Sequence, residues 1–248
     1  MNHLYQAAKR VVRSILPTHL LYQYELPLRK LFALGYRGKA VQCNLCQSEL
    51  SGFIRLETGD LLCPVCGSLP RHRRLWFLLE ERPLNGKVLH FSPARPLWRL
   101  FRQLPGIEYI PSDYEPNPLI QKRLDITKID LPDQGLDHVL CYHVLEHIED
   151  DQKAMTELYR VLRTGGQLLV QTPFKEGAIY EDFSIREPAD RLRHFGQEDH
   201  VRVYSVEGLK KRLEKAGFEV TVLQFENEEK NVRFGLSPEE KILVCKRK

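Results

Sequence analysis

The sequence predicts an α/β fold, a doubly wound parallel sheet preceded by helices and a small four-cysteine domain. Three observations support this prediction. Residues 124–173 read as strand, helix and strand, four cysteines form two closely spaced pairs, and the 248 residues have a globular composition, with 42% apolar and 28% charged residues. A chain of this length can bury ample core.

Residues 1–40 predict two helices. The first ends before Pro17 and has apolar residues on one side and basic residues on the other, namely Leu4, Ala8, Val11, Val12 and Ile15 against Lys9, Arg10 and Arg13. The second stops near Gly35 and carries Leu28, Leu31 and Phe32. Basic amphipathic helices can lie on membranes. For a helix this short, packing on its own protein is the expected outcome.

The positive charge of the chain is concentrated at its start. Residues 1–42 carry seven Lys and Arg against Glu25 alone, a net charge of +6, so with a total of +4 the remaining chain has −2. Since nucleic-acid-binding domains are usually basic throughout, nucleic acid is not the expected partner. No apolar run has the length of a membrane-spanning helix, and the N-terminus lacks the apolar core of a signal peptide. A cytoplasmic location is therefore expected.

Four cysteines have the spacing Cys-x2-Cys-x16-Cys-x2-Cys, at Cys43, Cys46, Cys63 and Cys66. Residues 53–56 and 61–62 flank a turn between the pairs, which predicts a hairpin with a cysteine knuckle at each end. Zn²⁺ favours four tetrahedral ligands, so the spacing predicts a zinc site, with iron or unbound thiols as alternatives. Four sulfurs leave no position open for water, which makes the site structural rather than catalytic.

The two knuckles differ at one backbone position. Gly67 follows the second pair and suits a residue with positive φ, whereas Gln47 stands at the equivalent place in the first. The remaining cysteines, Cys141 and Cys245, fall in predicted strands and are expected to be buried thiols in a reducing compartment.

A helix is predicted over residues 70–81, and it begins with four basic residues, Arg71, His72, Arg73 and Arg74. Such a cluster beside a zinc ribbon could bind phosphate or RNA. A solvated helix face is the favoured interpretation, because aromatic residues do not alternate with the basic ones.

The rest of the chain alternates strands and helices. Strands are predicted at residues 87–91, 108–111, 123–126, 137–142, 167–172, 219–225 and 241–246. The helix between the fourth and fifth has acidic residues in its first turn, Met155, Leu158, Tyr159 and Leu162 on one side, and Gly165-Gly166 at its end. Residues 174–204 show no periodicity, and a helix from Val206 ends at Gly217.

The segment from Leu131 to Gly166 resembles the class I methyltransferases that use S-adenosylmethionine. The matching residues are Leu131-Pro132, Leu136-Asp137-His138-Val139, His143-Val144-Leu145-Glu146-His147-Ile148 and Arg160-Val161-Leu162-Arg163-Thr164-Gly165-Gly166. The resemblance implies a seven-stranded Rossmann-like sheet, S-adenosylmethionine as cofactor and methyl transfer to an acceptor that the sequence does not name. The predicted domains are helices over 1–40, a zinc ribbon with a linking helix over 41–85, and the methyltransferase-like domain over 86–248.

In open α/β sheets, ligands bind beyond the carboxyl ends of the strands, where the strand order reverses. The predicted cofactor contacts follow these ends, at His90, Phe91, Ser92, Pro93, Asp113, Tyr114, Asp125, Ile126 and His143. By the resemblance, Asp113 binds the ribose hydroxyls and Asp125 the adenine amino group, with Ile126 beside the ring. A solvated turn is the alternative for Asp113, and packing before the helix is the alternative for His143.

The turn after the first strand of the sheet departs from the family pattern. The family usually has an acid followed by Gly-x-Gly-x-Gly, whereas this chain has Leu89-His90-Phe91-Ser92-Pro93-Ala94-Arg95. Small residues still allow a close-approach turn, but Pro93 lacks an N–H and a positive φ is harder to fill. A zinc-ribbon binding or adaptor protein with a degenerate methyltransferase domain, which could contact RNA, therefore stays as the alternative function.

No obligatory catalytic residue follows from the motifs. His194, in the aperiodic segment, is the first candidate base, and His143 is the second. Arg191, Arg193 and Arg202 could bind an anionic acceptor or form surface ion pairs. Glu146 and His147 are expected to be polar groups at the start of the helix rather than catalysts.

Overall fold

The computed structural model describes residues 1–248 apart from 1–4, 7–9, 11–13, 15–16, 121 and 227. The chain forms two units, each assembled from separate stretches of sequence. The first consists of Met1–Pro83, Ala94–Leu104 and Phe225–Glu240, and the second of Leu84–Pro93, Pro105–Gln224 and Lys241–Lys248. The division into residues 1–40, 41–85 and 86–248 stays a prediction.

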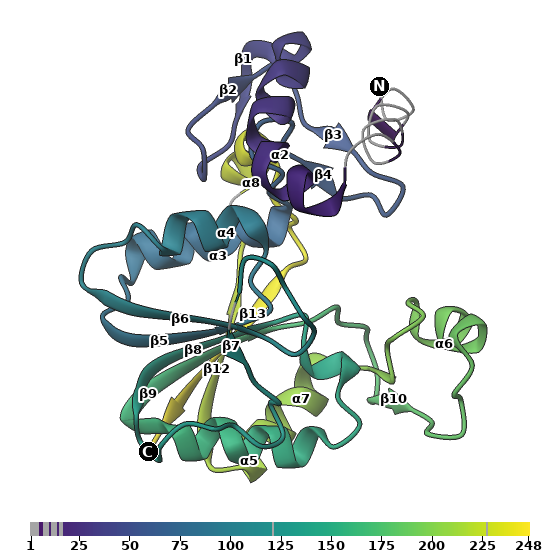
Figure 1. The fold of residues 1–248 in the computed structure, drawn as a ribbon. Helices are drawn as coiled ribbons and strands as arrows, with labels where there is room; N and C mark the ends of the chain where they lie inside the picture. Colours follow the sequence, from purple (N-terminus) through teal and green to yellow (C-terminus); the bar gives the residue numbers. More distant parts are fainter. Residues whose placement is uncertain (1–4, 7–9, 11–13, 15–16, 121, 227) are drawn as a thin grey trace. The chain divides into compact units, whose positions relative to one another are not determined.

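The second unit is built on a seven-stranded sheet with the order β12-β13-β9-β8-β5-β6-β7 (Figure 1). The strands are β5 (Gly86–Phe91), β6 (Ile107–Asp113), β7 (Lys122–Arg123), β8 (Leu136–Tyr142), β9 (Leu162–Gln171), β12 (Phe218–Gln224) and β13 (Lys241–Arg247). Strands β5 to β9 pair in parallel, and β13 runs antiparallel to both β9 and β12. This sheet confirms the predicted α/β, Rossmann-like fold.

Helices α5 (Asp151–Val161) and α7 (Val206–Lys215) lie on the same face of this sheet (Figure 1). Their apolar sides fill the core, with Met155, Leu158, Leu209 and Leu213 all fully buried. Strand β8 is buried without alternation from Val139 to Tyr142, as expected of a strand covered on both faces. Burial of Cys141 and Cys245 agrees with their prediction as core thiols.

Helix α5 ends earlier than predicted. It stops at Val161, because Leu162 is already extended and pairs with Leu136. Gly165-Gly166 therefore lie within β9. The guanidinium of Arg247 lies at this early end. It donates hydrogen bonds to the carbonyls of Tyr159, Arg160 and Leu162, which satisfies acceptors at the end of the helix.

Strand β7 is shorter than the predicted strand at residues 123–126. The carboxylate of Asp125 accepts hydrogen bonds from the backbone N–H of Thr127 at 2.8 Å and from its hydroxyl at 2.7 Å. A carboxylate that binds the backbone two residues later favours a turn. The turn ends the strand before Asp125.

The segment at residues 174–204, predicted to lack regular structure, contains three short elements. Strands β10 (Tyr180–Glu181) and β11 (Arg202–Val203) pair antiparallel, and helix α6 (Pro188–Phe195) lies between them. Only Phe195 of α6 is buried, so the sequence has no apolar period to reveal the helix. In Figure 1, β10 and α6 project from the sheet of this unit.

The first unit combines helices with two small hairpins. Its helices are α2 (Thr18–Phe32), α3 (Pro70–Glu81), α4 (Arg95–Phe101) and α8 (Glu228–Phe234), with a 3-10 turn η1 (Ala33–Tyr36) after α2. Strand β1 (Arg37–Gln42) pairs with β2 (Glu49–Leu50), and β3 (Ile54–Arg55) pairs with β4 (Leu61–Leu62). The second hairpin and helices α2 and α3 confirm the predictions, whereas α4 and α8 were not predicted.

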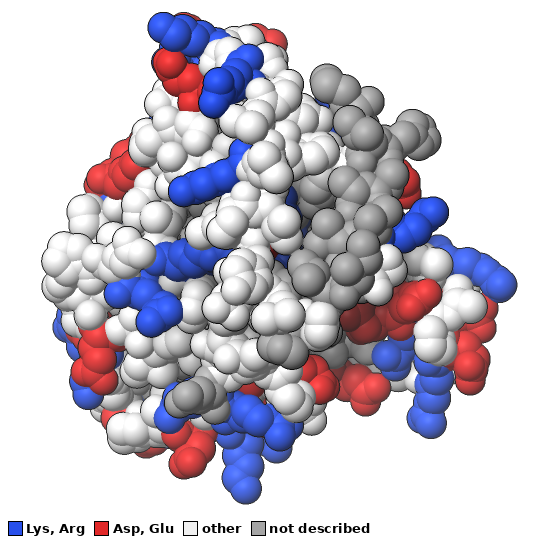
Figure 2. Space-filling model, turned by 45° about the horizontal axis from the view of Figure 1, so that its top comes forward, with Lys and Arg blue, Asp and Glu red and all other residues white. Residues whose placement is uncertain are grey.

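The apolar positions predicted for the first N-terminal helix, Leu4, Ala8, Val11, Val12 and Ile15, lie outside the described residues. Within the part of the chain that is described, no helix has the length and apolar character needed to cross a membrane. On the face drawn in Figure 2, basic side chains are interspersed with acidic ones.

Candidate functional site

The strand order reverses around β5, which lies between β6 and β8. Three side chains follow the carboxyl ends of these strands: Ser92 after β5, Asp113 at the end of β6 and His143 after β8. The backbone N–H of Ser92 donates to the carbonyl of Ser112 at 2.7 Å, which joins the ends of β5 and β6. This edge is the switch point at which open α/β sheets bind ligands.

The carboxylate of Asp113 is held by three donors. Ser92 Oγ and the backbone N–H of Tyr114 each donate to Oδ1 at 3.0 Å, and Asn117 Nδ2 donates to Oδ2 at 3.0 Å. The side chain is half-buried, so the carboxylate is oriented but still reachable. Sequence reasoning found Asp113 and missed Asn117, whose position in a turn gives no signal of this contact.

Ser92 has a positive φ of 43°. Here the family pattern has glycines, which reach positive φ without steric cost. A non-glycine residue at this place is strained, and the strain is expected where the backbone must approach a ligand. The sequence therefore predicted the difficulty correctly, and the chain meets it with a serine that also contacts Asp113.

The remaining residues at the ends of β5 and β6 differ in exposure. Phe91 and Pro93 are buried, whereas Tyr114 is exposed. His90 is only 1% exposed, and its Nδ1 lies 3.2 Å from the hydroxyl of Tyr109. Burial lowers the pKa of His90 to about 3, so its imidazole is neutral.

Asp125 and Ile126 lie in the turn after β7. Asp125 is exposed and its Oδ1 binds Thr127, while Ile126 is buried in the core of the unit. The turn thus presents a carboxylate to solvent beside an apolar side chain.

His143 adopts a positive φ of 54° immediately after β8. Its backbone N–H donates to the carbonyl of Gln171 at 2.8 Å, and its Nδ1 lies 3.3 Å from Glu146 Oε1. Glu146 is 1% exposed, in a 3-10 turn, η2 (Leu145–His147). Glu146 and His147 thus lie in a turn that precedes α5, which begins at Asp151, and their role as polar groups rather than catalysts stays a prediction.

The projecting segment contains the other candidate base. His194 is exposed near the end of α6, and its Nδ1 lies 2.7 Å from the hydroxyl of Tyr180. Arg193 forms a surface ion pair with Asp190, and Arg191 lies 3.6 Å from Glu149. Surface pairing, the alternative to anion binding, therefore describes Arg193.

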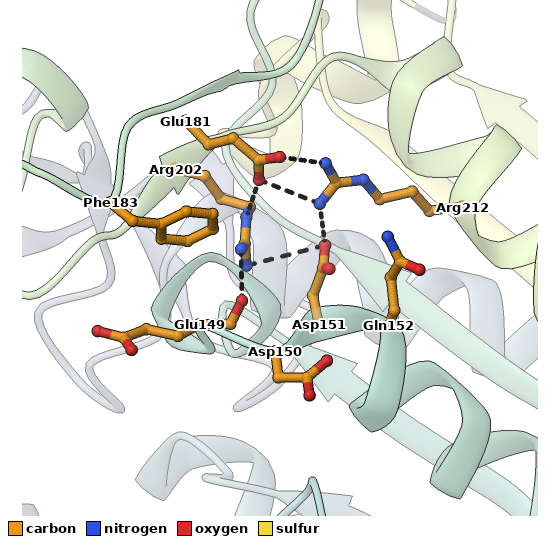
Figure 3. Close-up of a pocket in the computed structure, with 8 residues that line it drawn as sticks. All are labelled: Glu149, Asp150, Asp151, Gln152, Glu181, Phe183, Arg202 and Arg212. Atoms are coloured by element: carbon orange, nitrogen blue, oxygen red, sulfur yellow. Dashed lines mark hydrogen bonds and ion pairs between the residues drawn. The ribbon is translucent and has the colours of Figure 1, made fainter.

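A cavity of about 410 Å³ opens beside this segment (Figure 3). Its lining residues are Glu149, Asp150, Asp151, Gln152, Glu181, Phe183, Arg202 and Arg212. None of the predicted cofactor residues lines it. The cavity and the predicted cofactor contacts at the strand ends therefore have no residue in common.

Arg202 organises the wall of this cavity. It is 1% exposed, donates to Glu181 Oε2 at 2.8 Å and also to the carbonyls of Ile148 and Glu149. Arg212 joins the same network at 2.5 Å from Asp151 Oδ2. Arg202 therefore forms buried ion pairs with Glu181 and Asp151 rather than the surface pairs of one alternative, and its binding of an anionic acceptor stays a prediction.

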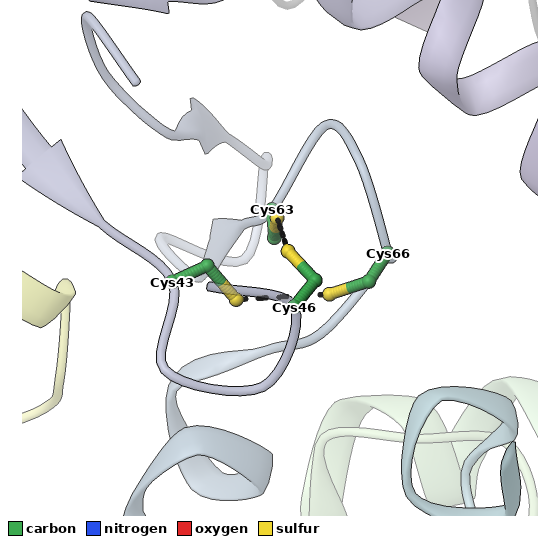
Figure 4. Close-up of side chains that lie close together, drawn as sticks. All are labelled: Cys43, Cys46, Cys63 and Cys66. Carbon is green, nitrogen blue, oxygen red and sulfur yellow. Dashed lines mark hydrogen bonds between the residues drawn. The ribbon is translucent and has the colours of Figure 1, made fainter. Parts of the chain in front are cut away.

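The four paired cysteines converge in the first unit (Figure 4). Cys43 Sγ lies 3.7 Å from Cys66 Sγ, and Cys46 Sγ lies 3.8 Å from Cys63 Sγ. A tetrahedral Zn²⁺ with bonds of about 2.3 Å separates its sulfur ligands by about 3.8 Å. The sulfur positions therefore fit a zinc ion.

Both knuckles have the same backbone conformation. Gln47 and Gly67 have positive φ values of 58° and 79°. The N–H of Cys43 donates to Ser48 O at 3.0 Å, and the N–H of Cys63 donates to Ser68 O at 2.9 Å. The prediction for Gly67 is confirmed, and Gln47 takes the same conformation without the steric freedom of glycine.

Arg73 and Arg74 are buried, at 0% and 2% exposure, so the predicted solvated face is wrong. Arg73 donates to the carbonyls of Leu61, Ser68, Phe234 and Gly235 at 2.6–2.8 Å. Desolvation lowers the pKa of its guanidinium, and the nearby cysteines oppose this effect. Arg73 therefore ties the second knuckle to the end of α8 and is unavailable to RNA.

The sequence model of the methyltransferase domain family matches residues 70–223, more than half of the chain. A curated protein of Mycolicibacterium smegmatis, described as a probable S-adenosylmethionine-dependent methyltransferase, is 35% identical over 96 residues. The match covers 39% of this chain and 34% of that protein, so the chain matches about a third of its relative's length.

Two solved structures share the fold. One is a SAM-dependent methyltransferase from Archaeoglobus fulgidus, with 17% identity and a TM-score of 0.50 over 70% of this chain and 91% of that one. The other is a chain in the complex of the Haloferax volcanii Trm112 methyltransferase activator with a methyltransferase, with 12% identity and a TM-score of 0.50 over 72% and 91%. The chain belongs to the methyltransferase domain family.

Proposed function

We propose that the chain binds S-adenosylmethionine at the carboxyl ends of β5, β6 and β8 and transfers its methyl group to an acceptor. The observation that carries the proposal is the oriented carboxylate of Asp113. It lies at the switch point of the sheet, in a chain that belongs to the methyltransferase domain family. A carboxylate at this place can accept the two hydroxyl hydrogens of a ribose.

Asp113 fits this role with one adjustment. A carboxylate offers about four acceptor positions, and three are used by Ser92 Oγ, Tyr114 N–H and Asn117 Nδ2. To accept hydrogen bonds from two ribose hydroxyls, the carboxylate would have to release the side chain of either Ser92 or Asn117. Both are side-chain donors, so this exchange needs no movement of the strand.

The other proposed cofactor contacts follow the carboxyl ends of β5, β6, β7 and β8. Asp125 would accept from the adenine amino group beside Ile126, and the remaining contacts would come from His90, Phe91, Ser92, Pro93, Tyr114 and His143. Of these residues, His90 fits a direct cofactor contact least well, because its buried imidazole is directed to Tyr109 rather than to solvent.

The cofactor supplies an activated methyl group on a sulfonium sulfur. Its transfer is an in-line displacement, for which proximity and alignment provide much of the acceleration. A base is needed only when the acceptor ionises poorly. His143, at the end of β8, and His194, beside Tyr180, are the proposed candidates for this base.

Methyl transfer can be tested with methyl-labelled S-adenosylmethionine and a cellular metabolite extract, read by mass spectrometry. The wild-type protein should label a specific compound, Asp113→Ala should lose most of this labelling, and Asp130→Ala, which removes an exposed aspartate elsewhere, should retain it. Absence of any protein-dependent labelled compound would count against the transfer.

A second candidate function is a zinc-ribbon binding or adaptor protein with a degenerate methyltransferase domain. The strained Ser92, in place of the family's glycines, is the observation that favours it. This function predicts no binding of S-adenosylmethionine, so calorimetry distinguishes the two.

We also propose that Cys43, Cys46, Cys63 and Cys66 bind a structural zinc ion, supported by their sulfur separations. Elemental analysis should find at least one zinc per chain. Cys63→Ser should lose that ion, whereas Cys245→Ala, outside the cluster, should keep it. A zinc content well below one per wild-type chain would refute the site.

A further inference from the structure

A second group of metal-ligating side chains lies in the unit that holds the sheet. One ligand atom from each of Glu146, His147 and His200 lies within 4.8 Å of the others. Glu146 and His147 come from the turn η2, and His200 precedes β11. We propose that these three residues bind a divalent transition-metal ion beside the carboxyl end of β8.

The carboxylate of Glu146 is buried and has few polar partners. The residue is 1% exposed, and neither oxygen has a hydrogen-bond partner of acceptable geometry among the described residues. Its Oε1 lies 3.3 Å from His143 Nδ1. Burying a carboxylate is costly unless a cation or several donors compensate, and a metal ion would provide that compensation.

The two imidazoles are oriented as metal ligands usually are. His200 is 4% exposed, its Nδ1 lies 3.3 Å from the carbonyl of Phe195, and its buried Nε2 has no partner among the described residues. His147 Nδ1 lies 3.3 Å from Asp199 Oδ2. A ligating histidine commonly donates its other N–H to a carbonyl or carboxylate, which directs the free nitrogen at the metal.

The rings themselves are close, with centroids 4.7 Å apart and planes at 84°. Metal bonds of about 2.1 Å need ligand atoms about 3.4 Å apart in a tetrahedral arrangement. The ligand atoms of the three residues lie within 4.8 Å of one another, so only small side-chain movements would bring them to this spacing.

Two imidazoles and one carboxylate favour Zn²⁺, Fe²⁺, Co²⁺ or Mn²⁺ over Ca²⁺, which prefers oxygen ligands alone. Three protein ligands also leave a coordination position open, unlike the four-sulfur cluster. The open position would suit an oxygen of the acceptor, such as a hydroxyl. This last point rests on the proposed methyl transfer, whereas metal binding does not.

Cobalt chloride added to full-length protein that contains one zinc per chain, held by the four cysteines, provides the test. Co²⁺ bound by nitrogen and oxygen gives visible absorption without the sulfur-to-metal bands that a cysteine site would show. We expect one Co²⁺ per chain with this nitrogen–oxygen spectrum. Because binding is read without cofactor or acceptor, its result is independent of the proposed methyl transfer.

Glu146→Gln and His200→Ala should each weaken Co²⁺ binding by more than about tenfold, since even residues that merely orient ligands cost that much. Glu198→Gln, which changes an exposed residue outside the cluster, should bind as the wild type does. Circular dichroism and retained cysteine-bound zinc verify that the variants fold. A wild-type protein that takes up no further Co²⁺ at millimolar concentration, or folded variants with unchanged binding, would overturn the proposal.

Discussion

At the scale of single residues, left-handed backbone positions occur in the proposed cofactor site and in the four-cysteine zinc site. Of the described residues other than glycine, four have a positive φ: Gln47, Ser92, Gln134 and His143. Gln47 lies in a cysteine knuckle, and Ser92 and His143 follow the strands that would hold the cofactor. Because such conformations cost free energy, their position at the two sites supports a functional constraint.

The strain at Ser92 can be measured with two substitutions. Ser92→Ala and Ser92→Gly both remove the hydrogen bond to Asp113, but only glycine relieves the positive φ. Ser92→Gly should therefore be more stable than Ser92→Ala by about 1 kcal/mol. Hydrogen exchange of the β5 amides measures the difference. Equal stability of the two variants would show that the backbone is unstrained.

Arg73 should be essential to the stability of the first unit. Lysine cannot reproduce its four carbonyl contacts, and buried carbonyls without donors are costly, so Arg73→Lys should lower the free energy of unfolding by at least about 3 kcal/mol. Arg71→Lys, at a partly exposed position, should change it by less than about 0.5 kcal/mol. Tryptophan fluorescence in urea reports on this unit, which contains both tryptophans, Trp76 and Trp98. Similar losses in both variants would contradict the role.

His90 should make the sheet unit sensitive to acid. Its pKa falls from 6.5 to about 3 through burial, so the unfolded chain takes up the proton first. The contribution is complete above pH 6.5 and is lost as the pH falls from about 6.5 to 3, by up to about 1.4 kcal/mol per pH unit. An NMR titration measures the imidazole pKa directly. A value near 6.5 in the folded protein would contradict this account.

Residue chemistry could be predicted where local sequence determines it. Gly67 and the four cysteines followed from spacing, and the difficulty at Ser92 followed from missing glycines. Arg73, Asn117 and His200 could not be identified in this way, because their partners depend on tertiary contacts. The basic run around Arg73 looked like a solvated face, yet its carbonyl partners Phe234 and Gly235 lie far away in sequence.

At the scale of elements, long apolar segments were predictable and short ones were not. The apolar run of β8 and the amphipathic pattern of α5 each identify one element, because burial on both faces or along one side leaves a clear pattern. By contrast, α6 buries a single residue, and β10 and β11 have two residues each. The positions of β10 and β11 depend on the contact of Arg202 with Glu181 rather than on an apolar period.

The end of α5 supplies a test at this scale. Arg247→Met would remove the donor for the carbonyls of Tyr159, Arg160 and Leu162, and should destabilise the sheet unit by about 1–3 kcal/mol. Lys246→Met, next to it and exposed, should cost less than about 0.5 kcal/mol. Far-UV circular dichroism during urea unfolding compares them. If Arg247→Met were as stable as the wild type, another group would have to satisfy these carbonyls.

For the whole molecule, the sequence motifs predicted the sheet correctly because they span the central strands β8 and β9 and the helix between them. Helix α4 and Phe225–Glu240 group with the N-terminal residues in one compact unit, and the domain division into 1–40, 41–85 and 86–248 stays a prediction. Contacts of this kind join distant stretches and leave no periodic signal.

Calorimetric titration of the full-length protein with S-adenosylhomocysteine, the product of the proposed transfer, tests the central claim most directly. The account predicts one binding site per chain, weakened at least about tenfold in Asp113→Ala by the loss of charge-assisted hydrogen bonds and unchanged in Asp130→Ala. The absence of heat change with either S-adenosylhomocysteine or S-adenosylmethionine at millimolar concentration would contradict it.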